Sequence, residues 1–262
     1  MNFTLYLSLN TIPAIFILGL FVLREKKKEP LSIVLSTFAL TYVIVLPLDL
    51  LISVVDPYLD DNFNAQHFFS LDSFFRAAFL EEFLKFSVIF LFIYRQTHFD
   101  ELSDGIIYGI AVGLGYAVVE NYNYLFLEYI NQKPMVEFIK NRWWALIAHV
   151  SLGIVMGMFL AKSRIQKFNN KLMLSLALVI PIFLHGLHNY TFVSDPLYQI
   201  YIDYYLLGFN LILISASFIF LRKFESIKFD NPYKAELKDY FRTIFIGLIF
   251  SLIFAYIFGF IY

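Results

Sequence analysis

The 262-residue sequence contains no cysteine. This absence excludes disulfide scaffolds, thiol catalysis, iron–sulfur clusters and zinc sites of the cysteine type. Charge is also scarce, since 16% of the residues are Asp, Glu, Lys or Arg, against about 25% in an average soluble domain. The net charge is −1 and there is no long basic run, so nothing indicates a nucleic-acid partner.

Apolar residues dominate the composition. The chain is 60% hydrophobic and 20% aromatic, with 32 Phe and 18 Tyr, and its mean hydropathy is +0.69. A soluble globule of this size could not keep so much apolar surface away from water. The composition therefore predicts an integral membrane protein.

Eight apolar runs are long enough to cross a hydrocarbon core, which takes about 20 helical residues. They cover residues 3–23, 31–54, 73–94, 105–129, 143–161, 172–193, 199–221 and 243–262. The connections between them are short. We therefore expect an all-α, polytopic membrane protein with about eight transmembrane helices in one integral membrane domain, residues 1–262.

Basic residues are divided unevenly between the two sides of the membrane. The segments 24–30, 95–104, 162–171 and 222–242 hold 15 Lys and Arg residues, whereas the alternate side holds 3, all within 130–142. Because Lys and Arg accumulate in cytoplasmic loops, both termini are expected outside.

Charged side chains lie in the middle of the third apolar run. Glu81 is four residues and Glu82 three residues before Lys85, so all three share one region of a helix. A charge inside a spanning helix costs about 2.5–3.5 kcal/mol, and such residues usually face a cavity and act there. One Glu–Lys pair could simply make the helix tolerable to lipid, but a second Glu is not needed for that. Two carboxylates beside an ammonium group suit general acid–base chemistry.

The fourth run, 105–129, carries glycines and then two polar residues. Gly105, Gly109 and Gly113 are spaced by four, which predicts close packing against a neighbouring helix. Glu120 and Asn121 follow near the outer end, where Glu120 is either interfacial or part of a polar site.

The fifth run places His149 on a row of small residues with four-residue spacing, namely Ala145, Gly153 and Gly157. These small residues allow a neighbouring backbone to come close on the face that carries the histidine. A single histidine in a helix is more often a structural hydrogen-bonding group than a catalyst.

The sixth run repeats this spacing with different residues. Pro181, His185 and Asn189 are four residues apart, with His188 between the last two. Pro181 leaves one backbone carbonyl without its usual helical donor, which favours a kink just before His185.

The depth of the polar residues links these four runs. Counted from the outer ends of their runs, Glu81, Glu82, Glu120, His149 and His185 lie roughly 9–14 Å below the outer surface, at ~1.5 Å per residue. Helices of alternating direction would rarely place polar residues in one layer by chance. We therefore predict a single polar site in the outer half of the bilayer.

Four segments form an ordered series of motifs: Glu81 to Lys85 (EExxK), Asp104 to Asn121, His149 to Gly153, and His185 to Asn189 (HxxxN). This series resembles that of the PrsW family, which is similar to the wider group of CAAX prenyl proteases, bacteriocin-processing homologues and APH-1-like membrane proteins. The resemblance covers residues 73–193, a four-helix core expected to be catalytic.

The resemblance implies an intramembrane protease in a bacterial cytoplasmic membrane. It associates the family with the first, outer-side cut of a membrane-anchored anti-sigma factor. The implied partners are a membrane-anchored protein or peptide substrate and the lipid bilayer. By position, the paired catalytic glutamates fall on Glu81 and Glu82, the motif histidines on His149 and His185, and the following asparagine on Asn189.

Peptide hydrolysis needs a water molecule, a base, donors for the oxyanion and an acid for the leaving amine. We expect one carboxylate of Glu81 and Glu82 to be the base and His149 to help position the water. Lys85 would hold the second carboxylate ionised.

The remaining polar residues have expected roles around this base. His185 and Asn189, one turn apart, are expected to donate to the oxyanion. Glu120 and Asn121 are expected to support the site, although the prenyl-protease pattern has no equivalent of this pair.

The same residues could instead hold a zinc ion. His149, His185 and Glu81 would then be its ligands and Glu82 the base. PrsW proteins are often described as metalloproteases, but the ligands would come from separate helices and no HExxH motif is present. The cofactor is therefore open between none and zinc, and the metal-independent mechanism is favoured because Lys85 would repel a dication.

Two other classes of protein also place buried carboxylates and histidines in a membrane. A secondary transporter or channel uses them to relay protons or bind ions, and a non-catalytic scaffold uses them to hold helices together. No internal repeat is detectable and the polar residues lie in four consecutive helices, which favours the protease.

Overall fold

The computed structural model describes residues 3–60, 70–130, 135–165, 169–191, 196–223, 228–229 and 232–259. Within these ranges the chain forms eight helical segments and no β-strand, apart from one isolated bridge between Glu101 and Lys228. The prediction of an all-α protein is confirmed.

The helices follow the eight predicted runs in order. Their bounds are α1 Phe3–Arg24, α2 Leu31–Asp60, a third helix of η1 Asp72–Phe79, α4 Leu80–Val88 and η2 Ile89–Ile93, then α5 Leu102–Ile130, α6 Met135–Lys162, α7 Asn170–Thr191, α8 Pro196–Lys223 and α9 Leu237–Gly259.

The last helix begins at Leu237, earlier than the predicted residue 243. The chain enters the helix there because the carboxylate of Asp239, the third helical residue, accepts the backbone N–H of the preceding Glu236 at 3.0 Å, as in a capping box.

Five helices are long and apolar enough in their described parts to cross a membrane: Leu102–Tyr124, Arg142–Lys162, Asn170–Tyr190, Tyr204–Arg222 and Leu237–Gly259. Shorter apolar stretches lie in α1 and α2. The chain is a multi-pass membrane protein, as its composition predicted.

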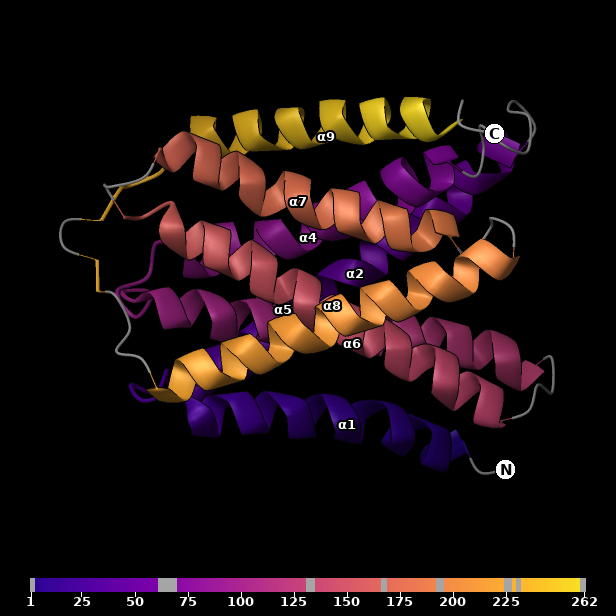
Figure 1. Cartoon of the computed structure of the whole chain (residues 1–262), viewed down its shortest axis with the longest axis horizontal. Coiled ribbons are helices and arrows are strands. Elements are labelled where there is room, and N and C mark those ends of the chain that lie inside the picture. The colour runs from indigo at the N-terminus through magenta and orange to yellow at the C-terminus, as the bar shows by residue number, and fades with distance from the viewer. Residues whose placement is uncertain are drawn as a thin grey trace.

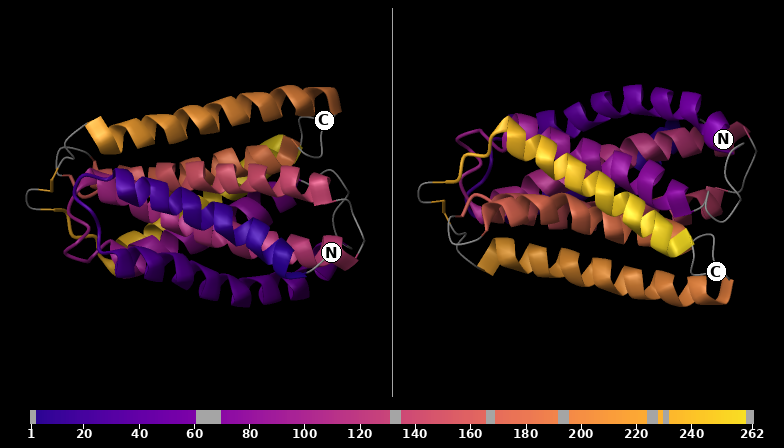
Figure 2. Two further views of the ribbon diagram at one scale, coloured as in Figure 1. Left: turned by 90° about the horizontal axis from the view of Figure 1, so that it is seen from below. Right: turned by 90° about the horizontal axis from the view of Figure 1, so that it is seen from above.

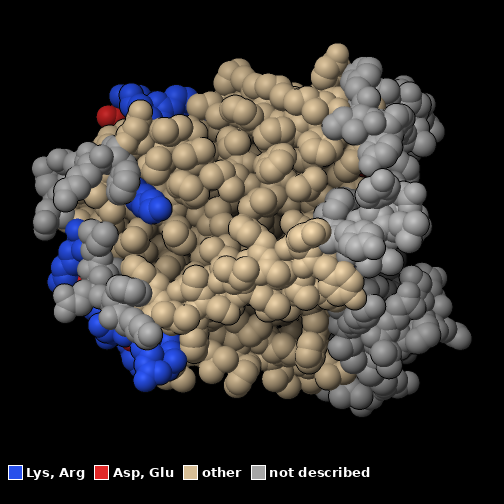
Figure 3. Space-filling view, viewed as in Figure 1, with Lys and Arg blue, Asp and Glu red and all other residues tan. Residues whose placement is uncertain are grey.

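The helices form one bundle around α5 (Figure 1). The apolar stretch of α5 is completely buried, and the helix contacts α1, α2 and α6. α9 packs on α7 and η1, whereas α8 forms an outer layer against α6 and α7 (Figures 1 and 2). Lys and Arg on the visible face gather at the end opposite to the start of α1 and the end of α9, which fits the predicted orientation (Figure 3).

The glycines of α5 meet those of α6, as their spacing predicted. A Cβ atom added at Gly109 would collide with the carbonyl group of Gly153, and one at Gly105 would collide with that of Gly157. At Gly113 the obstacle would be the backbone of His149. The two backbones therefore touch, and this contact fixes where His149 sits relative to α5.

We expect Gly109→Ala to destabilise the protein by about 1–3 kcal/mol, because the added methyl group has no space unless the helices separate. Thermal unfolding in detergent measures the change. The matched control is Gly208→Ala on α8, where nothing lies within 4 Å of an added Cβ. Equal unfolding temperatures for the two variants would contradict the close packing.

Buried carboxylates tie the α1–α2 connection to the start of α5. Glu25 and Glu29 are 3% and 6% exposed, and Glu25 Oε2 accepts the backbone N–H of Glu29 at 3.1 Å. The Tyr108 hydroxyl donates to Glu29 Oε2 at 2.6 Å. Burial raises the pKa of Glu25 to about 8, and the nearby Asp104 carboxylate adds to this effect.

This raised pKa predicts a pH-dependent stability. The ordinary pKa of the group is 4.5. The folded protein therefore binds the proton more tightly, and the unfolding free energy falls as the pH rises between about 4.5 and 8. We expect Glu25→Gln, which keeps the acceptor for Glu29, to flatten this fall and to raise the unfolding temperature at about pH 8. An unchanged slope in thermal unfolding across this range would show that Glu25 does not titrate as described.

Candidate active site

The third helix carries three of the predicted site residues and contains two π-helical stretches. α4 holds Glu81, Glu82 and Lys85, with η1 before it and η2 after it. π-Helical turns are rare and occur frequently at functional sites. The sequence pattern did not indicate them.

α7 is held against η1 by an aromatic ring beside Gly186. A Cβ at Gly186 would collide with the ring of Phe74, which also packs on the ring of Phe258 at a centroid distance of 4.9 Å. Because Gly186 directly follows His185, this contact positions the histidine opposite α4.

Lys85 lies at the centre of the cluster and is completely buried. Its ammonium group donates to Glu82 Oε1 at 2.7 Å and to His149 Nδ1 at 2.9 Å. It also lies 4.3 Å from the centroid of the Tyr116 ring. A buried charge is stable only with such partners, so Lys85 joins α4, α5 and α6.

The hydrogen bonds assign the protons on both histidines. An ammonium group only donates, so His149 Nδ1 accepts and its Nε2–H donates to Glu120 Oε2 at 2.8 Å. His185 Nδ1–H donates to Glu82 Oε1 at 2.8 Å, which leaves its Nε2 3.8 Å from Glu81 Oε2. Both nitrogens of His149 are therefore engaged, whereas His185 keeps one facing Glu81.

Arg142 extends this chain of contacts and was missed by the sequence analysis. Its guanidinium group lies 3.6 Å from Glu120 Oε1 and 3.9 Å from the centroid of the Tyr124 ring. Arg142 precedes His149 by two helical turns and so lies on the same face of α6. That spacing in the sequence could have identified Arg142 as a residue of the polar site.

A cavity of about 650 Å³ opens beside the cluster. Predicted site residues in its lining are Glu81, Glu120, His149, His185 and Asn189. Glu82 and Lys85 lie behind this lining. The cavity extends past Arg142 to Asp72 and Arg76 in η1, near the end of the third helix that the sequence predicts to be the outer one.

Asn121, which was expected to support the site, does not line the cavity, but its side-chain amide donates to the backbone carbonyl of Arg142 at 3.5 Å. Its side-chain amide donates to Asn10 Oδ1 at 2.7 Å, and Asn10 donates in turn to the carbonyl of Val118 at 3.2 Å. One residue along a helix turns the side chain by about 100°, so Asn121 faces α1 while Glu120 faces the cavity.

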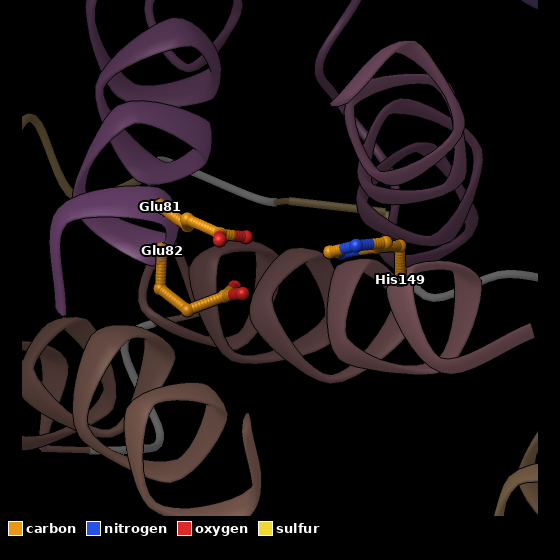
Figure 4. A group of neighbouring side chains, drawn as sticks. All are labelled: Glu81, Glu82 and His149. Atoms are coloured by element: carbon orange, nitrogen blue, oxygen red, sulfur yellow. The ribbon is translucent and has the colours of Figure 1, made fainter. Parts of the chain in front are cut away.

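Among the described residues, Glu81, Glu82 and His149 form a group with metal-binding geometry, which shares Glu81 and His149 with the expected set. Ligand atoms of Glu81, Glu82 and His149 lie within 4.8 Å of one another, and the two glutamates point towards the histidine (Figure 4). His185 is outside this group, and its Nδ1 lies 2.8 Å from Glu82 Oε1. Among the described residues, Oε2 of Glu81 and Oε2 of Glu82 have no hydrogen-bond partner.

This set does not fit a metal ion in the observed arrangement. His149 has no free lone pair, since Lys85 occupies Nδ1 and Nε2 carries the proton given to Glu120. A metal ion bound to His149 would have to displace the Lys85 ammonium group, which lies 2.9 Å from Nδ1 of that histidine. The two cations would repel each other at such short range.

Comparison with known proteins identifies the family of the chain, which is described as a metalloprotease family. The profile described as "PrsW family intramembrane metalloprotease" matches residues 29–218. The chain belongs to the PrsW family of intramembrane proteases. The predicted resemblance and enzyme class are thereby confirmed, and the transporter and scaffold hypotheses are set aside.

Relatives in the PrsW family cover most of the chain. Protease PrsW of Bacillus subtilis is 34% identical over 79% of this chain and 89% of its own length. Protease PrsW of Oceanobacillus iheyensis is 32% identical over 70% of this chain and 81% of its own length. Protease PrsW of Geobacillus kaustophilus is 27% identical over 77% of this chain and 86% of its own length. No solved structure matches the chain.

Proposed function

We propose that this PrsW-family chain cleaves a membrane-anchored protein near the outer side of the bilayer, with Glu81 as the base that activates water. The observation that carries the proposal is the difference between the two glutamates. Glu81 lines the cavity, whereas Glu82 lies behind it with Oε1 bound by both Lys85 and His185.

The surroundings of Glu81 suit a base. Its Oε2 is buried without a hydrogen-bond partner in the described part of the chain, so a lone pair is available for the proton of a water molecule. Lys85 Nζ lies 3.7 Å and His185 Nε2 3.8 Å from this oxygen.

The reaction then proceeds as a water-mediated hydrolysis. Glu81 takes one proton from water while the water oxygen bonds to the carbonyl carbon of the peptide. His185 and Asn189, one turn apart on α7, donate to the oxyanion that forms. For Nε2 to donate, His185 must carry both ring protons, and its place between two carboxylates stabilises that form. The proton on Glu81 passes to the amine nitrogen as the C–N bond breaks.

His149 has a different part from the one expected for it. With both nitrogens engaged it does not position the water but holds Lys85, which in turn holds Glu82. Glu120 and Arg142 hold His149 from the other side. These are positioning residues, because they act through the carboxylates and not on the substrate.

No metal is required in this mechanism. A zinc ion would activate a water molecule by lowering its pKa. Here Glu81 would activate the water instead, as a general base. The favoured substrate is a single-span protein cut outside the membrane centre, and the specific candidate implied by the PrsW resemblance is an anti-sigma factor.

Glu81→Gln is expected to lower the cleavage rate by about 10²–10⁴-fold, because the amide cannot accept the proton of water. Cleavage of a co-expressed single-span substrate measures the loss. The unfolding temperature is expected to stay near that of the parent, because Gln keeps the size of the side chain.

The matched control is Asp72→Asn, which removes a carboxylate from the lining of the same cavity. This variant is expected to retain cleavage. If Glu81→Gln cleaved as fast as Asp72→Asn, Glu81 would not be the base.

Metal removal tests the cofactor separately. The purified chain, treated with a strong chelator and freed of metal by elemental analysis, is expected to cleave its substrate at the untreated rate. Loss of cleavage that is restored by added zinc, with no change in unfolding temperature, would overturn the metal-independent mechanism. The assignment of the chain as a protease would stand.

A further inference from the structure

Basic residues gather at one end of the bundle (Figure 3). A second cavity lies between helix ends whose lining includes Arg95, Arg164 and Lys234. Its volume is about 520 Å³. It is bordered by Tyr94 and Arg95 after η2, Arg164 after α6, and Lys234 and Leu237 at the start of α9. Because these are helix ends in the segments predicted to be cytoplasmic, the cavity lies at the level of the inner membrane surface.

Arg164 is the buried charge of this cavity, with 9% of its surface exposed. Its guanidinium group donates to the carbonyl of Tyr94 and lies 5.3 Å and 5.5 Å from the ring centroids of Tyr94 and Phe229. The buried Nε has no hydrogen-bond partner, and no carboxylate pairs with the group, within the ranges the structure describes. Arg164 therefore has an open donor and no direct carboxylate partner within those ranges.

Two further basic side chains add to this charge. Arg95 donates to the carbonyl of Ala235 at 3.2 Å, and neither Arg95 nor Lys234 forms an ion pair with an acidic residue that the structure describes. The acidic residue in the lining, Glu236, is already paired with Lys238 at 2.9 Å and is 66% exposed. The cavity thus offers three positive charges, none of which forms a direct ion pair with a described carboxylate.

We propose that this cavity binds the phosphate group of an anionic phospholipid of the inner leaflet. Guanidinium and ammonium donors match phosphate oxygens, and basic pockets between helices at the cytoplasmic side are suited to lipid head groups.

Apolar side chains next to the cavity favour a lipid over free phosphate. Leu237 and Phe241 on α9 are 52% and 61% exposed and lie one turn apart. Leu91 and Phe92, before Arg95, are 44% and 46% exposed. These side chains lie deeper in the membrane than the charges, where the acyl chains of a bound lipid would contact them.

The test uses the full chain in neutral detergent with bound lipid removed. Phosphatidylglycerol, phosphatidylcholine of the same chain length, and inorganic phosphate are added separately, and native mass spectrometry and the unfolding temperature report binding. Phosphatidylglycerol is expected to bind at least tenfold more tightly than phosphatidylcholine and to raise the unfolding temperature. Equal binding of the two lipids, or an equal effect of inorganic phosphate, would overturn the proposal.

Variants locate the site. Arg95→Gln and Lys234→Gln are each expected to weaken phosphatidylglycerol binding by about fivefold, and Arg164→Gln by at least as much. The matched control is Arg222→Gln, which removes an exposed basic residue from the same end outside the cavity. Arg164 also binds the carbonyl of Tyr94, so Arg164→Gln could fail to fold. In that case the variants of the two exposed residues, Arg95→Gln and Lys234→Gln, carry the test. Equal weakening by Arg222→Gln would show a general charge effect and refute the site.

Discussion

The buried ammonium group of Lys85 is the constraint on which the polar centre depends. A charge removed from water needs all of its donors directed at partners, and here these partners come from three helices. Glu82 on α4, His149 on α6 and the ring of Tyr116 on α5 surround it. Because Lys85 takes one nitrogen of His149 and Glu120 takes the other, the proton on this imidazole is fixed. Because Lys85 and His185 both bind Oε1 of Glu82, Glu81 is left as the carboxylate that faces the cavity.

This polar centre requires backbones that approach closely, and glycine provides that approach at two interfaces. Along α5 and α6 the facing glycines bring carbonyl groups into contact, which carries His149 close to Lys85 and Glu120. At α7, Gly186 makes room for the Phe74 ring of η1 and so sets His185 beside Glu82. A larger side chain at either interface would lengthen hydrogen bonds of 2.8–2.9 Å, which the buried charges cannot exchange for water.

The helices and the shared depth of Glu81, Glu120, His149 and His185 could be predicted because apolar length and four-residue spacing are local properties of a sequence. The glycine contacts were predictable for the same reason. The sequence could not predict which glutamate faces the cavity. That depends on the partners of Lys85 from other helices and on the π-helical stretches around α4. Neighbouring residues on a helix point in different directions, which is why Asn121 faces α1. The zinc ligand set stays a prediction, because residue spacing cannot show that Glu82 accepts a hydrogen bond from His185.

Charge balance connects this arrangement to the proposed chemistry. In the polar cluster the positive groups are Arg142 and Lys85, and the negative groups are the carboxylates of Glu81, Glu82 and Glu120. The other two charged residues of the cavity lining, Asp72 and Arg76, pair with each other. A second proton on His185 makes the cluster neutral, which is the least costly state in a medium of low dielectric constant. When Glu81 takes a proton from water, the cluster gains one positive charge as the peptide gains one negative charge. The oxyanion therefore forms beside the charge that its own formation creates, and the site remains neutral through the step that would otherwise be the most costly in a membrane.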